Sequence, residues 1–221
     1  ARAAHQRHAL AGAQREAEVG DQRRVEPAVA EGDVPQFEPA IEARHELAEL
    51  AAKASDGVDR ARWLEDLIAA DRAAGAARTD RSRFLAAGAA LEIARPLDGA
   101  ARAVTLAAPL DRSLLAKKQA LEAALAGYGR AAEYGIAAVT TEASFAMADL
   151  YRHLGQSLME SERPGDLSAE ELEQYDLLLE EQAFPFEEKA IGIHEKNASR
   201  AAAGVYDDWV RKSYAALAEM K

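Results

Sequence analysis

Apolar residues recur at steps of three and four along most of the chain, and no stretch alternates apolar and polar residues over the length of a half-buried strand. Such steps place side chains on one face of a helix. The pattern therefore predicts an all-α protein of seven to nine helices joined by short turns. The expected helices cover about 35–54, 58–74, 80–95, 111–134, 140–161, 168–203 and 205–220.

The acidic segment 167–203 is the expected organising element of the chain. Ser168, followed three positions later by Glu171, forms a capping box, so a helix should begin there. Pro185 lacks a backbone N–H and clashes with the preceding turn, which predicts a kink or a short break between Ala183 and Phe186. We therefore expect a long, bent element against which other helices pack.

Proline and glycine predict two further features. Pro96 is expected to end the third helix, which leaves 96–109 mostly as a connector. Gly127 and Gly129 fall inside the fourth helix, where each costs about 1 kcal/mol relative to alanine. We expect both glycines to mark places where another helix comes close. Thr140 or Thr141 is the expected start of the fifth helix.

Composition supports helices in close contact. Of the 221 residues, 54 are alanine, and valine, isoleucine and threonine are scarce. There are no cysteines, which excludes disulfides and thiolate metal sites. No apolar run approaches the length of a membrane-spanning helix. The chain starts without methionine, which predicts a fragment or a processed chain.

The charge distribution limits the kind of partner. A formal net charge of −11 argues against a phosphate-binding surface as the main role, so we expect no nucleic-acid partner. Eleven acids and one base, Arg163, lie between Glu160 and Glu188. This stretch is either a solvated acidic face or a docking surface for a basic partner.

A repeat signal lies in the second half of the chain. Met147-Ala148, Tyr151 and Gly155 have the spacing of the first helix of a tetratricopeptide repeat (TPR), where a small residue lets the paired helix approach. Generic packing of alanine-rich helices is the alternative reading of the same residues. The spacing of the second helix of such a repeat is matched just upstream by Ala124, Tyr128 and Ala131.

Two longer stretches of the second half add to this interpretation: EYGIAAVTTEASFAMADLYRHLGQSLMESERPGDLSAEELEQYDLLLEEQAFPFEEKAIGIHEKN and GVYDDWVRKSYAALAEM. They resemble the C-terminal part of large TPR proteins of Gram-negative bacteria, and the resemblance covers roughly 105–221. The resemblance implies a periplasmic or outer-membrane-associated scaffold that accompanies energised envelope transport or gliding motility. A cytoplasmic location stays open.

Two architectures fit the pattern of helix, short turn and helix. The first is a TPR-like α-solenoid of stacked antiparallel hairpins, and the second is a compact helical bundle. We expect degenerate hairpins over 1–104 and TPR-like hairpins over 105–221, joined in one continuous array.

The expected function is a non-enzymatic scaffold that binds a protein or peptide. A structural or oligomerisation domain of a larger protein is the alternative, and a helical metal-dependent enzyme is a remote one. If the TPR-like residues face the paired helix, helical geometry turns five others towards a ligand. These candidate partner-binding residues are Glu142, Phe145, Asp149, Arg152 and His153.

No catalytic, cofactor-binding or metal-binding motif is predicted. Glu42 and His45 have the Glu-x-x-His spacing of di-iron bundles, but such a site needs a second copy and the chain has none. The adjacent acids at 180–181 and at 187–188 do not face each other across a cleft, as a glycosidase requires. No glycine-rich phosphate loop and no nucleophile elbow occur.

Overall fold

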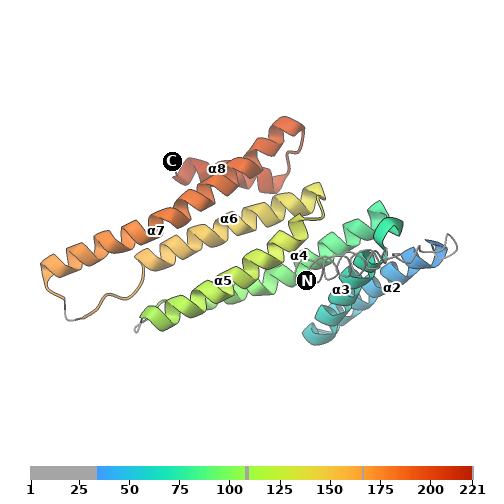
Figure 1. Cartoon of the computed structure of the whole chain (residues 1–221), viewed down its shortest axis with the longest axis horizontal. Coiled ribbons are helices and arrows are strands. Elements are labelled where there is room, and N and C mark those ends of the chain that lie inside the picture. The colour runs from blue at the N-terminus through green and yellow to red at the C-terminus, as the bar shows by residue number, and fades with distance from the viewer. Residues whose placement is uncertain (1–33, 108–109, 166, 221) are drawn as a thin grey trace, which may run out of the picture. The chain divides into compact units, whose positions relative to one another are not determined.

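The computed structural model describes residues 34–107, 110–165 and 167–220, and in these ranges all regular structure is helical (Figure 1). The all-α prediction is therefore confirmed for the described part of the chain. The start of the predicted 1–104 region, residues 1–33, lies outside it. The α-helices are α2 (Val34–Lys53), α3 (Gly57–Ala73), α4 (Asp80–Ala103), α5 (Leu110–Ala132), α6 (Ala137–Met159), α7 (Ala169–Ala198) and α8 (Asp208–Met220). Two short 3-10 helices are η1 (Gly75–Ala77) and η2 (Ser199–Ala203).

Each α-helix packs on the next one along the chain, and short turns make neighbours run antiparallel (Figure 1). The even-numbered helices α2, α4, α6 and α8 also contact one another in order. A core of alanine, leucine and isoleucine side chains runs through α2 to α6, and it includes Ile41, Leu67 and Leu150. Small alanines dominate this core, so helix axes can approach closely without leaving voids.

Several predicted helix ends are confirmed by their caps. Thr79 and Ser168 both form capping boxes, at the starts of α4 and α7. Gly204 ends η2 in the left-handed conformation, with φ of 82°. The predicted start of α6 was wrong, because α6 begins at Ala137. Gly135 ends the preceding turn with φ of 69°, and the chain re-enters a helix at once.

The predicted end of a helix at Pro96 and the predicted short break at Pro185 were also wrong, whereas the alternative of a kink at Pro185 stays a prediction. α4 continues through Pro96 as far as Ala103, and α7 is assigned as helix through Pro185. An interior proline removes one backbone hydrogen bond and costs about 3 kcal/mol. Packing along both helices offsets that cost, because α4 lies against α3 and α5 and α7 lies against α6 and α8. The connector between α4 and α5 is consequently shorter than 96–109.

The two glycines of α5 differ. A Cβ atom on Gly127 would lie 3.1 Å from the Cβ of Ala94 and 3.3 Å from its Cα, so α4 does approach closely there. A Cβ on Gly129 would meet nothing within 4 Å. The prediction of a close contact is confirmed at Gly127 and wrong at Gly129.

Candidate partner-binding surfaces

The five candidate residues predicted from the sequence all lie on α6, and all five side chains are partly buried. The structure does not bring them onto one open face. Glu142 and Asp149 turn towards α4, while Phe145 and Arg152 turn towards α8. Each of these four contacts another helix of the same chain. The candidate set therefore consists of two stripes whose centres lie about 60° apart around the helix axis.

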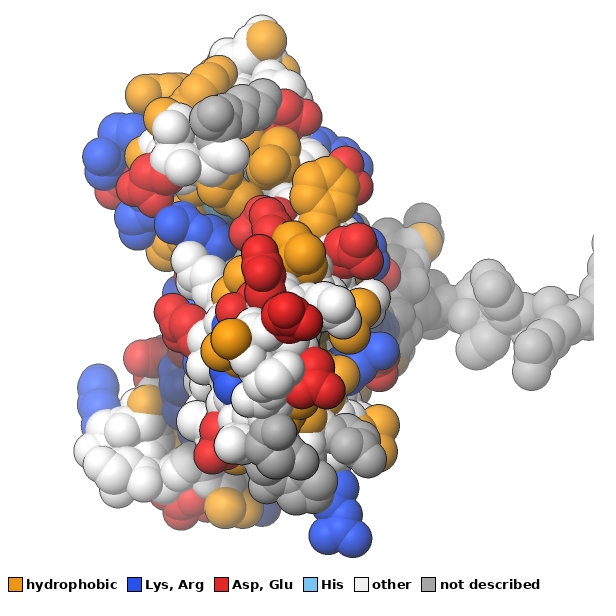
Figure 2. Space-filling model, turned by 90° about the vertical axis from the view of Figure 1, so that its left-hand side faces the viewer, with side chains coloured by type: hydrophobic (Ala, Val, Ile, Leu, Met, Phe, Trp, Pro, Cys, Tyr) orange, Lys and Arg blue, Asp and Glu red, His pale blue; other side chains and the backbone are white. Residues whose placement is uncertain are grey.

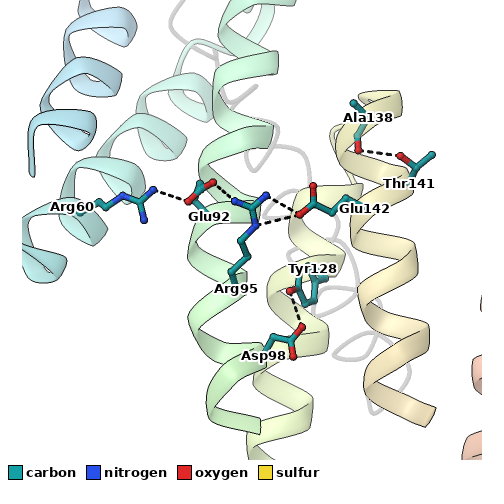
Figure 3. A network of polar contacts seen from close by, with 8 residues as sticks. All are labelled: Arg60, Glu92, Arg95, Asp98, Tyr128, Ala138, Thr141 and Glu142. Carbon is teal, nitrogen blue, oxygen red and sulfur yellow. Dashed lines mark hydrogen bonds and ion pairs between the residues drawn. The ribbon is translucent and has the colours of Figure 1, made fainter. Parts of the chain in front are cut away.

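Four ion pairs connect successive even-numbered helices, and we refer to them together as the ladder. Glu142 of α6 pairs with Arg95 of α4 at 2.7 Å. Figure 3 shows this pair as part of a chain that continues through Glu92 to Arg60 of α3. The other three rungs are Glu42–Arg81 at 2.6 Å, Arg102–Asp149 at 2.9 Å and Arg152–Glu219 at 3.1 Å. Because the charges are matched within the chain, this face has few free charges to offer a partner.

The ladder is held in place by half-buried polar contacts. Asp98 accepts from Arg102 and, at 2.9 Å, from the hydroxyl of Tyr128 on α5 (Figure 3). Burial, followed by the contact with Asp98, raises the pKa of Tyr128. The phenol therefore stays protonated and donates at neutral pH. His153 lies near the same arginine, and burial together with Lys117 and Arg102 lowers its pKa.

Phe145 is covered by aromatic and basic side chains of α7 and α8. Its ring centroid lies 5.4 Å from that of His194 and 5.4 Å from that of Trp209. Lys212 lies 3.8 Å from the centroid of the Trp209 ring, which is a cation–π distance. Phe145 consequently serves as packing between α6 and α8.

A buried polar junction beneath these rings was missed from the sequence. Asn197 of α7 donates at 3.1 Å to the backbone carbonyl of Thr141 and at 2.9 Å to the hydroxyl of Ser213. The Nδ1 atom of His194 lies 3.3 Å from the same hydroxyl. Burial lowers the pKa of His194, so its ring is neutral at pH 7. The four residues come from the three helices α6, α7 and α8, and nothing in their local sequence signals the contact.

An apolar groove lies between α5 and α7, over the end of α6. It has a volume of about 230 Å³. Leu158 is buried in its lining, Phe186 is partly buried there, and Leu178 remains 51% exposed at its edge. We call it the α5–α7 groove. Its lining consists of Leu110, Leu114, Lys118, Leu158, Tyr175, Leu178, Leu179, Gln182 and Phe186.

A second hollow, of about 370 Å³, borders the first half of α7. Met159, Leu172 and Leu177 line it together with acids of α7, Glu173 and Glu180 among them. Figure 2 looks onto the end of the molecule where α7 begins and shows acidic side chains interspersed with hydrophobic ones. Apolar and acidic groups therefore share this surface.

The structure offers no clear place for a catalytic metal in its described part. Residues 34–107, 110–165 and 167–220 contain no group of three or more histidines, cysteines or acids that could hold an ion. Glu42 of the Glu-x-x-His pattern is paired with Arg81, whose hydrogen bond lowers the pKa of that carboxyl. Among the described helices, none combines the length and the apolar character that crossing a bilayer requires.

Comparisons with known proteins give no further guide to identity. No protein-family model matches the chain, and searches of curated proteins and of solved structures find no match.

Proposed function

We propose that this protein is a non-catalytic, TPR-like scaffold that binds a helix of a partner protein in the α5–α7 groove. The order of helix contacts supports the architectural part. Each even-numbered helix packs on its odd-numbered neighbours and touches the next even-numbered helix, which is how hairpins stack in an α-solenoid. A compact bundle remains the alternative architecture.

The groove is the observation that carries the proposed binding. Leu178 is 51% exposed at the edge of a concave surface that is already apolar, and the neighbouring Leu177, in the second hollow, is 57% exposed. A contiguous exposed apolar patch on a folded protein is typical of an interaction site. A groove of this kind accommodates the apolar face of an amphipathic helix, whose anchors recur at three- and four-residue steps.

The charges around the groove select the kind of helix. Acids of α7 (Glu173, Asp176 and Glu180) line the second hollow next to the groove, whereas the charged side chain in the lining of the groove itself is the basic Lys118. Asp176 is already paired with Arg163 at 2.6 Å. The remaining acids favour a partner helix that carries lysine or arginine beside its apolar face.

The cellular setting of this scaffold rests on the resemblance of 105–221 to TPR proteins of Gram-negative bacteria. On that basis, we place the scaffold in an envelope assembly for transport or motility, in the periplasm or at the outer membrane.

Binding of a designed helix tests the proposal. The probe is a fluorescein-labelled amphipathic peptide of leucine and lysine, about 18 residues long so that it spans five helical turns. Fluorescence anisotropy should show saturable binding that a leucine–glutamate peptide of the same pattern does not reproduce. The variant Leu178→Ser should bind at least about tenfold more weakly, which corresponds to about 1.4 kcal/mol.

The matched control is Leu50→Ser on α2, because this leucine is exposed to a similar extent but lies outside the groove. It should bind like the unmodified protein. Equal binding by the two variants would reject the groove. Sedimentation would separate the oligomerisation alternative, in which the unmodified protein is a dimer and the α7 variant is a monomer.

A further inference from the structure

A second site of different chemistry lies at the turn between α3 and α4. Three arginines meet there, although the protein as a whole has a net charge of −11. Arg72 comes from the last turn of α3, Arg78 follows η1, and Arg83 lies in the first turn of α4. They line a pocket of about 180 Å³ together with Glu133 and Tyr134. We call it the arginine pocket.

The central arginine is held rigidly. Arg78 pairs at 2.7 Å with Asp71, a fully buried carboxylate that also accepts from the Ser82 hydroxyl at 2.7 Å. The Arg78 guanidinium lies 5.4 Å from the centroid of the Tyr134 ring. Its Nε atom is shielded from solvent and has no hydrogen-bond partner in the described structure. A guanidinium fixed in this way loses little conformational entropy when it binds an anion.

The two outer arginines are only weakly engaged. Arg83 lies 3.9 Å from the exposed carboxylate of Asp80 and donates a long hydrogen bond of 3.4 Å to the Tyr134 carbonyl. Arg72 forms no ion pair with a carboxylate among the described residues and lies close to the Tyr134 phenol. Glu133 is the one carboxylate in the lining. Three cations therefore face one lining acid and the already paired Asp71.

Tyr134 adds a polar group that points to a ligand. The residue is 7% exposed, and its hydroxyl is shielded from solvent without a partner in hydrogen-bonding geometry in the described ranges. A buried hydroxyl without a partner is costly, because it has given up its hydrogen bonds to water and gained none in return. Burial raises the pKa of Tyr134, so the phenol is a proton donor at neutral pH. An acceptor oxygen in the pocket would satisfy it.

We infer that the arginine pocket binds a phosphate group, as free phosphate or as a phosphomonoester. A phosphate group carries between one and two negative charges at neutral pH and has several acceptor oxygens, which suits two or more guanidinium groups and one phenol. A monocarboxylate has only two acceptor oxygens and a single charge. This site lies on α3, α4 and the end of α5, and the inference does not depend on the proposed partner helix.

Calorimetric titration with inorganic phosphate at constant ionic strength tests the inference. The unmodified protein should show saturable binding with one site per chain. Arg72→Gln/Arg83→Gln should weaken binding at least tenfold, and Tyr134→Phe, which removes only the hydroxyl, should weaken it severalfold. The charge-matched control is Arg62→Gln/Arg211→Gln, because both arginines are exposed and lie outside the pocket. Its affinity should stay within twofold of that of the unmodified protein.

Glycerol 3-phosphate, titrated in parallel, distinguishes the two sources of the phosphate group. Tighter binding of the ester identifies a phosphomonoester site, and tighter binding of inorganic phosphate identifies a site for the free anion. The inference is overturned if the unmodified protein shows no saturable binding of either ligand. It is equally overturned if the Arg72/Arg83 variant retains full affinity while its melting temperature is unchanged.

Discussion

Two surfaces of the molecule differ in whether their exposed side chains already have partners within the chain. One is the face formed by α2, α4, α6 and α8, and the other is the α5–α7 groove. On the first, acids and arginines pair across successive helices as the ladder, for example Arg95 with Glu142 and Arg152 with Glu219. In the groove, apolar side chains such as Leu178 stay in contact with solvent. A matched charge gains little from a partner, whereas a covered leucine gains hydrophobic free energy. The difference favours the groove as the docking surface.

The largest expected effect in this comparison concerns the floor of the groove. Phe186 is partly buried and packs against both apolar clusters of the described structure, whereas Phe184, two residues away, is 57% exposed. Phe186→Ala should lower the free energy of unfolding by about 2–3 kcal/mol, somewhat less than for a fully buried ring. Phe184→Ala should change it by less than about 0.5 kcal/mol.

Urea unfolding followed by circular dichroism measures both values. Equal losses in the two variants would show that Phe186 contributes no more to the floor of the groove than an exposed ring does.

The next effect concerns the packing beneath the ladder, where α5 meets α4. Gly127→Ala forces a Cβ against Ala94, whose Cα is only 3.3 Å away, so the backbone must shift. We expect a net loss of about 1–2 kcal/mol after the gain in helix propensity is included. Gly129→Ala meets open space and should stabilise the protein by about 0.5–1 kcal/mol. Thermal unfolding should therefore shift in opposite directions, and a shared direction would contradict the close contact.

The pH dependence of folding stability tests the buried polar junction between α6, α7 and α8, which contains His194. Burial lowers the pKa of His194, while Asp149 acts in the opposite direction and Arg152 in the same one. The unfolded state therefore binds a proton that the folded state does not, and stability falls as the pH decreases below about 6.5, the usual histidine value. One proton limits the slope to about 1.4 kcal/mol per pH unit.

Replacement by a residue that does not titrate isolates this contribution. His194→Gln should flatten the dependence of stability on pH between about pH 5 and 6.5 relative to the unmodified protein. The stability-versus-pH curve of the variant is subtracted from that of the unmodified protein. The subtraction is needed because His153 also has a lowered pKa and titrates in both proteins. Identical slopes would assign the pH dependence to other groups.

The smallest expected effect concerns the ladder itself. Arg152→Glu removes the pair with Glu219, whose side chain is 64% exposed. We expect a loss of no more than about 1 kcal/mol, and less at high salt, because exposed ion pairs contribute little and are screened. Binding of the leucine–lysine peptide should stay within twofold. A tenfold loss of binding would instead favour the predicted ligand-facing residues of α6 over the groove.

The local sequence determined the class and most of the helix ends. Helical periodicity and alanine content predict an all-α chain, and capping pairs such as Thr79 with Ser82 and Ser168 with Glu171 act within four residues. Gly204 adopts a left-handed conformation that other residues rarely take. These features depend on neighbours along the chain, which the sequence shows directly.

Tertiary packing decided the rest, because its terms arise between residues far apart in sequence. Helix packing offset the local cost of Pro96 and Pro185, so neither proline ended its helix. A candidate such as Glu142 faces solvent or a neighbour according to where Arg95 lies, 47 positions away. The arginine pocket likewise joins Arg72 to Tyr134. The sequence determined which faces each helix has, and the packing of the helices determined which of those faces are already occupied.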